Sequence, residues 1–192
     1  MMRTLWCGCL ILCLASPALA QVEPKSGGAQ PPTNPAQMGT PVGTLSLSGH
    51  VTAGDDAPSF ELPSTTGRDR SLHSLKGDWV VLLFMPRKGD FVPFQKVVAE
   101  FAKLPATIVG ITFDNPQSLR ALAKKEKLSF ELLGDPTGEV SASYGLFDGP
   151  SNTTRAGVIV VDRRGMVRLV VSGQTLPPAE VLSLTSLTIE GS

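Results

Sequence analysis

Thiols are almost absent from this chain, and their positions decide which chemistry it can perform. Its three cysteines are Cys7, Cys9 and Cys13, so residues 14–192 contain none. That absence excludes disulfides, thiolate metal ligands and a thiol nucleophile from this long stretch. We expect the packing of apolar side chains to supply its stability.

Histidine is scarce, and neither sign of charge is in excess. The two histidines, His50 and His73, are far apart in the sequence, so the spaced ligands of a zinc or copper site are lacking and we expect no metal and no cofactor. Lysine plus arginine equals aspartate plus glutamate at 17 each, which argues against a general attraction to nucleic acid or anionic membranes. A glycine-rich phosphate-binding loop ending in Lys-Ser or Lys-Thr is missing too.

The first 20 residues have the pattern of an export signal. Arg3 precedes an apolar stretch over residues 5–14, and Ala18-Leu19-Ala20 supplies the small-x-small pattern of a cleavage site. Because the apolar run breaks at Ser16-Pro17, it falls short of the roughly 20 residues that span a bilayer. We therefore expect cleavage after Ala20 and no membrane span in the mature chain.

Lipid attachment is the minor alternative to simple cleavage. Leu10-Ile11-Leu12-Cys13 has an aliphatic residue three positions before a cysteine, but Leu12 stands where a small residue is expected. Either route predicts an exported protein in the periplasm, the cell envelope or the extracellular space.

The remainder divides into a tether and one domain. Residues 21–49 are rich in Pro, Gly, Gln, Ser and Thr with few large apolar side chains, a composition typical of a flexible tether. Residues 50–192 have the length and hydrophobic content of a single globular domain.

Apolar segments of two kinds alternate in this domain and predict an α/β fold with a mostly parallel sheet. Residues 79–84 form an almost unbroken apolar run, which is typical of a central strand covered on both faces. Further strands are expected at 107–113 and 130–133. Residues 157–161 and 167–171 are predicted to form a hairpin around the turn residues 162–165.

Helices are expected between these strands. Pro93 suits a first helical position, and apolar residues follow it at three-to-four spacing as far as Leu104. Asn115 is a predicted cap of the next helix, one or two helical turns should lead to Tyr144, and Pro177-Pro178 should open a last helix.

Several short motifs, in order, resemble the alkyl hydroperoxide reductase and thiol-specific antioxidant family, the peroxiredoxins or redoxins. The resemblance spans residues 54–187. The motifs are Gly54-Asp55-Asp56-Ala57-Pro58-Ser59-Phe60-Glu61-Leu62, Ser71-Leu72-His73-Ser74-Leu75-Lys76-Gly77, Phe84-Met85-Pro86 with Asp90-Phe91-Val92-Pro93-Phe94-Gln95, Asp135-Pro136-Thr137-Gly138-Glu139-Val140, and Tyr144-Gly145.

This resemblance implies a thioredoxin-like fold, with a central mixed sheet flanked by helices, and an active-site loop at residues 86–95. The family's positions would be Pro86, Val92, Gln95 and Arg155, with Gln95 where the peroxidatic cysteine stands and Val92 where a hydroxyl residue stands. An amide has no ionisable proton near neutral pH and cannot attack a peroxide O–O bond, so these residues predict no catalytic group.

Each of the other candidate residues also has a structural or surface role as an alternative to a functional one. Arg155 resembles the family arginine that orients peroxide, but its spacing to Asp162 leaves open whether it faces the pocket or solvent. His73 is interpreted as a polar residue in a surface turn and Met85 as core filling. Lys124 belongs to a short basic run that could dock an acidic partner, although such runs are more often a solvated helix face.

Two functions follow. The first is a non-catalytic binding or scaffold module, a pseudoenzyme with an unknown protein or small-molecule partner. The second is an antioxidant oxidoreductase of the peroxidase type that works by an unrecognised route or through a partner's thiol. The family also makes a homodimer possible, and whether the chain is an enzyme stays open at this point.

Overall fold

Strand β3 (Trp79–Phe84) is the centre of the structure, a computed structural model that describes residues 50–192. Each of its six residues is buried. The predicted central strand is therefore confirmed with the bounds that its apolar run indicated. The expected signal, tether and cysteines of residues 1–49 lie outside the described residues.

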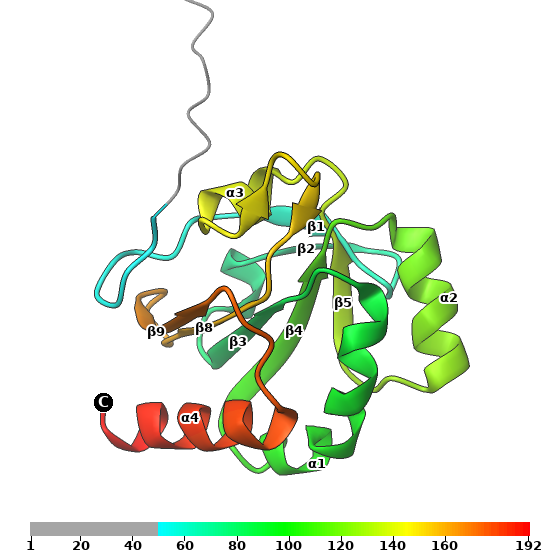
Figure 1. Ribbon diagram of the computed structural model, residues 1–192. Coiled ribbons are helices and arrows are strands. Elements are labelled where there is room, and N and C mark those ends of the chain that lie inside the picture. The colour runs from blue at the N-terminus through cyan, green and yellow to red at the C-terminus, as the bar shows by residue number, and fades with distance from the viewer. Residues whose placement is uncertain (1–49) are drawn as a thin grey trace, which may run out of the picture. The chain divides into compact units, whose positions relative to one another are not determined.

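The main sheet has five strands in the order β5-β4-β3-β8-β9 (Figure 1). β3 pairs in parallel with β4 (Ala106–Thr112), which pairs in parallel with β5 (Glu131–Gly134). On its other side β3 is antiparallel to β8 (Gly157–Val161), which is antiparallel to β9 (Val167–Ser172). The sheet is thus mixed, as the family resemblance implied, and the expectation of a mostly parallel sheet is wrong because the predicted hairpin adds two antiparallel pairings.

Short elements and helices complete the domain. They are β1 (Glu61–Pro63), β2 (Asp69–Ser71), the 3₁₀ segments η1 (His73–Leu75) and η2 (Lys88–Lys96), α1 (Val98–Phe101), α2 (Pro116–Glu126), α3 (Glu139–Ser143), β6 (Phe147–Asp148), β7 (Thr153–Thr154) and α4 (Pro178–Glu190). None of the helices in residues 50–192 is long and apolar enough to cross a membrane.

Alternate residues of β3 face two separate hydrophobic clusters, as the period of a strand requires. Val80, Leu82 and Phe84 pack in a cluster with side chains from β1 and α3. Val81 and Leu83 pack in the other cluster, which the residues of η2, α1, α2 and α4 complete. Figure 1 shows these two covers on opposite sides of the sheet.

The helix predicted after Pro93 differs from the expectation. Residues 88–96 form 3₁₀ turns with Pro93 inside them, and only Val98–Phe101 is α-helical. The apolar spacing indicated correctly which side chains face the core, since Phe94 and Phe101 are both buried. However, Pro93 has no N–H to donate, and the β-branched residues Val92 and Val97 lower helix propensity around it.

The remaining local predictions are confirmed. The Oδ1 atom of Asn115 accepts a hydrogen bond from the Ser118 backbone N–H at 2.8 Å and so caps α2. In the β8–β9 turn, the Asp162 carboxylate accepts bonds from the backbone N–H groups of Arg164 and Met166 at 2.8 and 3.0 Å. These bonds fix the turn that the sequence indicated.

Gly110 in β4 is tightly packed, so a substitution there tests the packing of the core. A β-carbon there would lie 2.6 Å from Leu132 Cδ2 and 2.7 Å from Phe91 Cε1. We predict that Gly110→Ala lowers the free energy of unfolding by about 1–3 kcal/mol, because two buried side chains must move. Urea denaturation measures this change. Gly89→Ala is the matched control, since its β-carbon meets nothing within 4 Å, and an equal loss in both variants would contradict the packing argument.

Candidate functional site

Pro86 and Arg155 lie at the same edge of the sheet, beyond the C-terminal end of β3. Gly157 pairs with Phe84, so the antiparallel register puts Arg155 level with Pro86. The Thr153 hydroxyl donates a hydrogen bond to the Pro86 carbonyl oxygen at 3.3 Å and ties the two segments together. This edge is where the resemblance placed an active site.

Arg155 is turned largely toward solvent there. Its side chain is 55% exposed, and its Nη2 lies 3.4 Å from the Asp148 carboxylate. Hydrogen bonds from Ser151, together with the charge of Arg155, lower the pKa of Asp148. The guanidinium is therefore engaged with an acidic neighbour at the surface.

Gln95 is directed elsewhere. Its Oε1 accepts a bond from the Ser129 backbone N–H at 2.7 Å, and its Nε2 donates to the Ser129 hydroxyl at 3.0 Å. Ser129 precedes β5, whose first residue Glu131 is level with Leu82 in the middle of β3. The structure thus brings Pro86 and Arg155 to one edge and holds the Gln95 amide toward the opposite end of the sheet.

The backbone of residues 88–96, which includes Val92 and Gln95, is also not the start of an α-helix. A thiolate is stabilised by the N–H groups and dipole at the start of an α-helix. Half-buried Val92 lies instead within the 3₁₀ turns of η2. The nearby charges are paired with each other, Arg87 with Asp90 at 3.2 Å and Lys88 with Asp114 at 3.8 Å.

The other two candidates, His73 and Met85, lie where a surface residue and a core residue are expected. His73 is exposed in η1, and Met85 is completely buried in the core. Among residues 50–192, no group of three or more His, Cys, Asp or Glu side chains could hold a metal ion.

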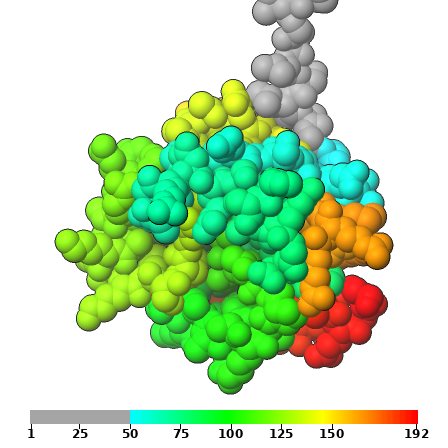
Figure 2. All heavy atoms as spheres, turned by 180° about the vertical axis from the view of Figure 1, so that it is seen from behind, coloured from blue at the N-terminus to red at the C-terminus, as the bar shows by residue number. Residues whose placement is uncertain are grey.

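A second site is a groove of about 660 Å³ at the other end of the sheet. The segment between β1 and β2, the helices α1 and α2, and the first residues of β4 and β5 surround it. Figure 2 shows the hollow between the teal β1–β2 segment, the green α1 region and the yellow-green α2–β5 region. Its volume lies within the range of small-molecule pockets.

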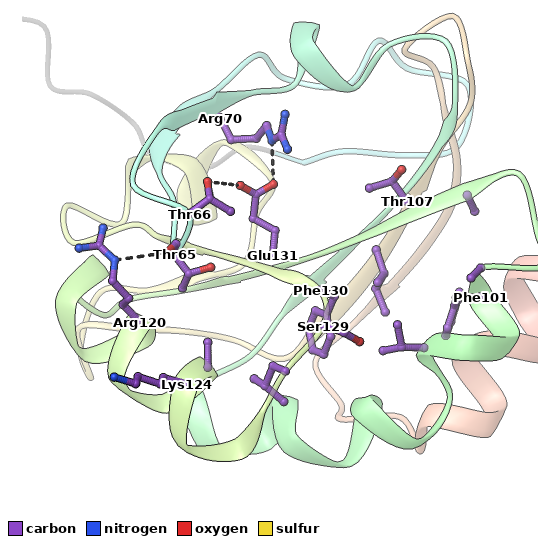
Figure 3. Close-up of a pocket in the computed structure, with 16 residues that line it drawn as sticks. Thr65, Thr66, Arg70, Phe101, Thr107, Arg120, Lys124, Ser129, Phe130 and Glu131 are labelled. Carbon is purple, nitrogen blue, oxygen red and sulfur yellow. Dashed lines mark hydrogen bonds and ion pairs between the residues drawn. The ribbon is translucent and has the colours of Figure 1, made fainter.

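A polar network closes one side of this groove (Figure 3). The Arg70 Nε donates to one carboxylate oxygen of Glu131 at 2.7 Å. The other oxygen accepts from the Thr66 hydroxyl at 3.1 Å and from the Ser64 hydroxyl. Burial alone would raise the pKa of Glu131, but the bonds from Ser64, Arg70 and Thr66 outweigh it and lower that pKa.

Sequence reasoning missed the network because its partners are distant in the chain. Arg70 and Glu131 are 61 residues apart, and Ser64 is 67 residues from Glu131. No periodicity or short motif joins such positions. Only the predicted basic run pointed to this face, through Lys124, which lines the groove.

Comparison with solved structures defines the class of protein. The domain superimposes on peroxidoxin BcpB of Mycobacterium tuberculosis with a TM-score of 0.65 at 28% identity, covering 72% of this chain and 98% of that one. A mutant of PrxQ from Xylella fastidiosa gives 0.65 at 16% identity, covering 74% and 99%. The fold is therefore the thioredoxin-like fold of the peroxiredoxins.

Sequence comparison gives the family. Residues 53–170 match the AhpC/TSA family. The chain is 35% identical to chloroplastic peroxiredoxin Q of Sedum lineare over 153 residues, covering 73% of this chain and 80% of that protein. It is 32% identical to chloroplastic peroxiredoxin Q of Populus jackii over 140 residues, covering 68% and 65%. This chain belongs to the AhpC/TSA family and is a peroxiredoxin-like redoxin.

The Glu131 network makes a prediction for stability. Glu131→Gln should lower the free energy of unfolding at neutral pH by about 1 kcal/mol, since an amide N–H₂ would face donors and the charge opposite Arg70 is lost. A lowered pKa in the folded state stabilises above the usual glutamate pKa, and the effect is lost as the pH falls through the lowered value. The difference from wild type in urea unfolding should therefore shrink between about pH 6 and about pH 3.

The control for this prediction is Glu61→Gln, which removes an exposed carboxylate outside the network. It should leave the unfolding free energy nearly unchanged at both pH values. A Glu131→Gln difference that is independent of pH would contradict the assigned role of the carboxylate.

Proposed function

We propose that this chain is an exported member of the AhpC/TSA family that binds a partner or ligand and does not itself reduce peroxides. One observation is decisive for the proposal: residues 14–192 contain no cysteine. The thiol mechanism that the family resemblance implies oxidises a thiolate to a sulfenic acid, and no other side chain in this region can replace that sulfur.

The geometry of the positions that resemble the family's active site supports this proposal. The 3₁₀ turns of η2 offer no α-helix start to an anion, the Gln95 amide is bonded to Ser129, and Arg155 is paired with Asp148. Each group that resembles a family position thus has a different, satisfied role. The edge is held together by packing and hydrogen bonds that need no thiol.

A second function has one observation in its favour. A cavity of about 250 Å³ lies beside η2, lined by η2 residues including Asp90, Pro93 and Phe94 and by residues 175–178, which lead into the first turn of α4. Such a cavity could receive a thiol from another protein, in which case the chain would act as an antioxidant oxidoreductase with that partner.

The first test is peroxide consumption by the full chain with a small dithiol as reductant. We expect the rate to equal that of a variant in which Cys7, Cys9 and Cys13 are all replaced by serine, and of the dithiol alone. Turnover by the serine variant would overturn the proposal. Turnover by wild type alone would assign activity to the three N-terminal cysteines.

Two cysteine insertions in the serine background test the site geometry. The Gln95 side chain is directed toward Ser129, whereas Pro93 lines the cavity between η2 and the start of α4. We expect Pro93→Cys to consume peroxide faster than Gln95→Cys, on the order of tenfold, because catalysis depends on placement of the reacting group. Faster turnover by Gln95→Cys would support the position that the sequence indicated and contradict this reading of the structure.

Export is tested separately by producing the full chain in a Gram-negative bacterium and separating the periplasm from the cytoplasm. We expect the periplasmic protein to begin at Gln21, because Ala18-Leu19-Ala20 precedes it. Mass spectrometry of the intact chain distinguishes this outcome from an uncleaved Met1 terminus or a lipid-modified Cys13, either of which contradicts cleavage after Ala20.

A further inference from the structure

The groove between α1, α2 and the β1–β2 segment has an extended apolar bed. Phe101 and Phe130 are almost completely buried beneath it, while Val98 and Leu128 are partly open to it. The bed is completed by Ala102, Ala106, Ile108 and Ala123. An apolar ligand lying here would be removed from water over much of its length.

Two cationic side chains lie beside this bed. Arg120 and Lys124 are one turn apart on α2, and both line the groove (Figure 3). The Arg120 Nε donates to the Thr65 carbonyl oxygen at 3.2 Å, which leaves its terminal nitrogens available. Within residues 50–192 neither side chain has a carboxylate partner, in contrast to neighbouring Lys125, which is paired with Glu126 at 3.3 Å.

Among residues 50–192, Glu131 is the only acidic side chain that lines the groove, and Arg70 is paired with it. Both Glu131 oxygens are already occupied by Arg70, Thr66 and Ser64, so this carboxylate does not compete for Arg120 or Lys124. The described part of the chain therefore gives the groove two positive charges that have no acidic partner and lie next to an apolar surface.

The cationic side chains and the apolar bed also lie at different sides of the groove. In Figure 3, Arg120 and Lys124 lie at one side of the pocket, whereas Phe101 lies at the other. A compact polyanion would leave the apolar side uncovered, and a neutral apolar molecule would leave the cations unpaired. A ligand with an anionic head at one end and an alkyl chain extending from it satisfies both.

We propose that this groove binds a free single-chain amphiphilic carboxylate, with its head at Arg120 and Lys124 and its chain along Phe101, Val98 and Leu128. Arg and Lys are suited to a carboxylate head, Arg through parallel N–H bonds and Lys as a point charge. The proposal deepens the binding role assigned to the domain and gives it a ligand class and a site distinct from the C-terminal edge of the sheet.

Decanoate is the probe, added to the full chain below the concentration at which it aggregates. Calorimetry should show one site, and backbone amide shifts in the ¹H–¹⁵N spectrum should concentrate in residues 98–108 and 120–131. Acetate, which has the head alone, and 1-decanol, which has the chain alone, should bind at least tenfold more weakly. Binding should also weaken with added salt.

Two variants separate the contributions. Arg120→Gln/Lys124→Gln should weaken decanoate binding by roughly tenfold or more, since two charge contacts are lost. Ala102→Trp should weaken binding by filling the apolar side from an exposed position. Arg163→Gln/Lys125→Gln is the matched control, because it makes the same charge change outside the groove and should bind as wild type.

Absence of decanoate binding, or equal binding by both double-glutamine variants, would overturn the proposal. So would binding only to phosphatidylglycerol vesicles and not to free decanoate, since that would make the ligand a membrane surface. Peroxide turnover by the serine variant would remove the proposed non-catalytic function but would leave this binding measurement unaffected, so the two failures are distinguishable.

Discussion

The structure depends on burying both faces of one strand. Every residue of β3 is buried, and alternate side chains belong to different hydrophobic clusters. A strand of this kind needs two covers, and the chain supplies them from different regions. The segments around β1 and α3 form one cover, whereas η2, α1, α2 and α4 form the other. The candidate positions at both ends of the sheet are consequently placed by β3 and its neighbouring strands.

The two ends of the sheet differ in how their charged side chains are paired. At the C-terminal edge, where the family resemblance placed an active site, the charged side chains are paired locally. The opposite end has an open groove in which Arg120 and Lys124 lack acidic partners among the described residues and Glu131 is held by three side chains. Polar groups that bond to one another within the protein have few bonds left for a ligand, whereas cations without acidic partners can form new ion pairs with one. The balance of satisfied and unsatisfied charge therefore favours the groove as the site for recognition.

Predictions from the sequence succeeded where one short segment contains all the information. The apolar run of β3, the Asn115 cap and the turn around Asp162 depend on neighbours within a few residues, and each is confirmed. The expected helix after Pro93 shows the limit, because apolar spacing reports which side chains are buried and not the type of turn that buries them. The pairing of Arg70 with Glu131 joins positions 61 residues apart and exists only once the β1–β2 segment meets β5. Candidate positions in the 86–95 loop could be named from the sequence, but the direction of the Gln95 side chain could not.

A redoxin domain without a thiol is physically reasonable because the nucleophile is not what holds its loop in place. Phe91 and Phe94, within η2, are 0% and 1% exposed and anchor that segment in the core. Phe91 packs edge-on against Phe130 with ring centroids 6.5 Å apart, and its ring occupies the space beside Gly110 that a β-carbon would fill. These apolar contacts supply the stability of the loop, and Phe130 also lines the groove at the other end of the sheet. The same packing therefore holds η2 at the core and shapes the bed of the proposed binding site, so neither feature depends on a thiol.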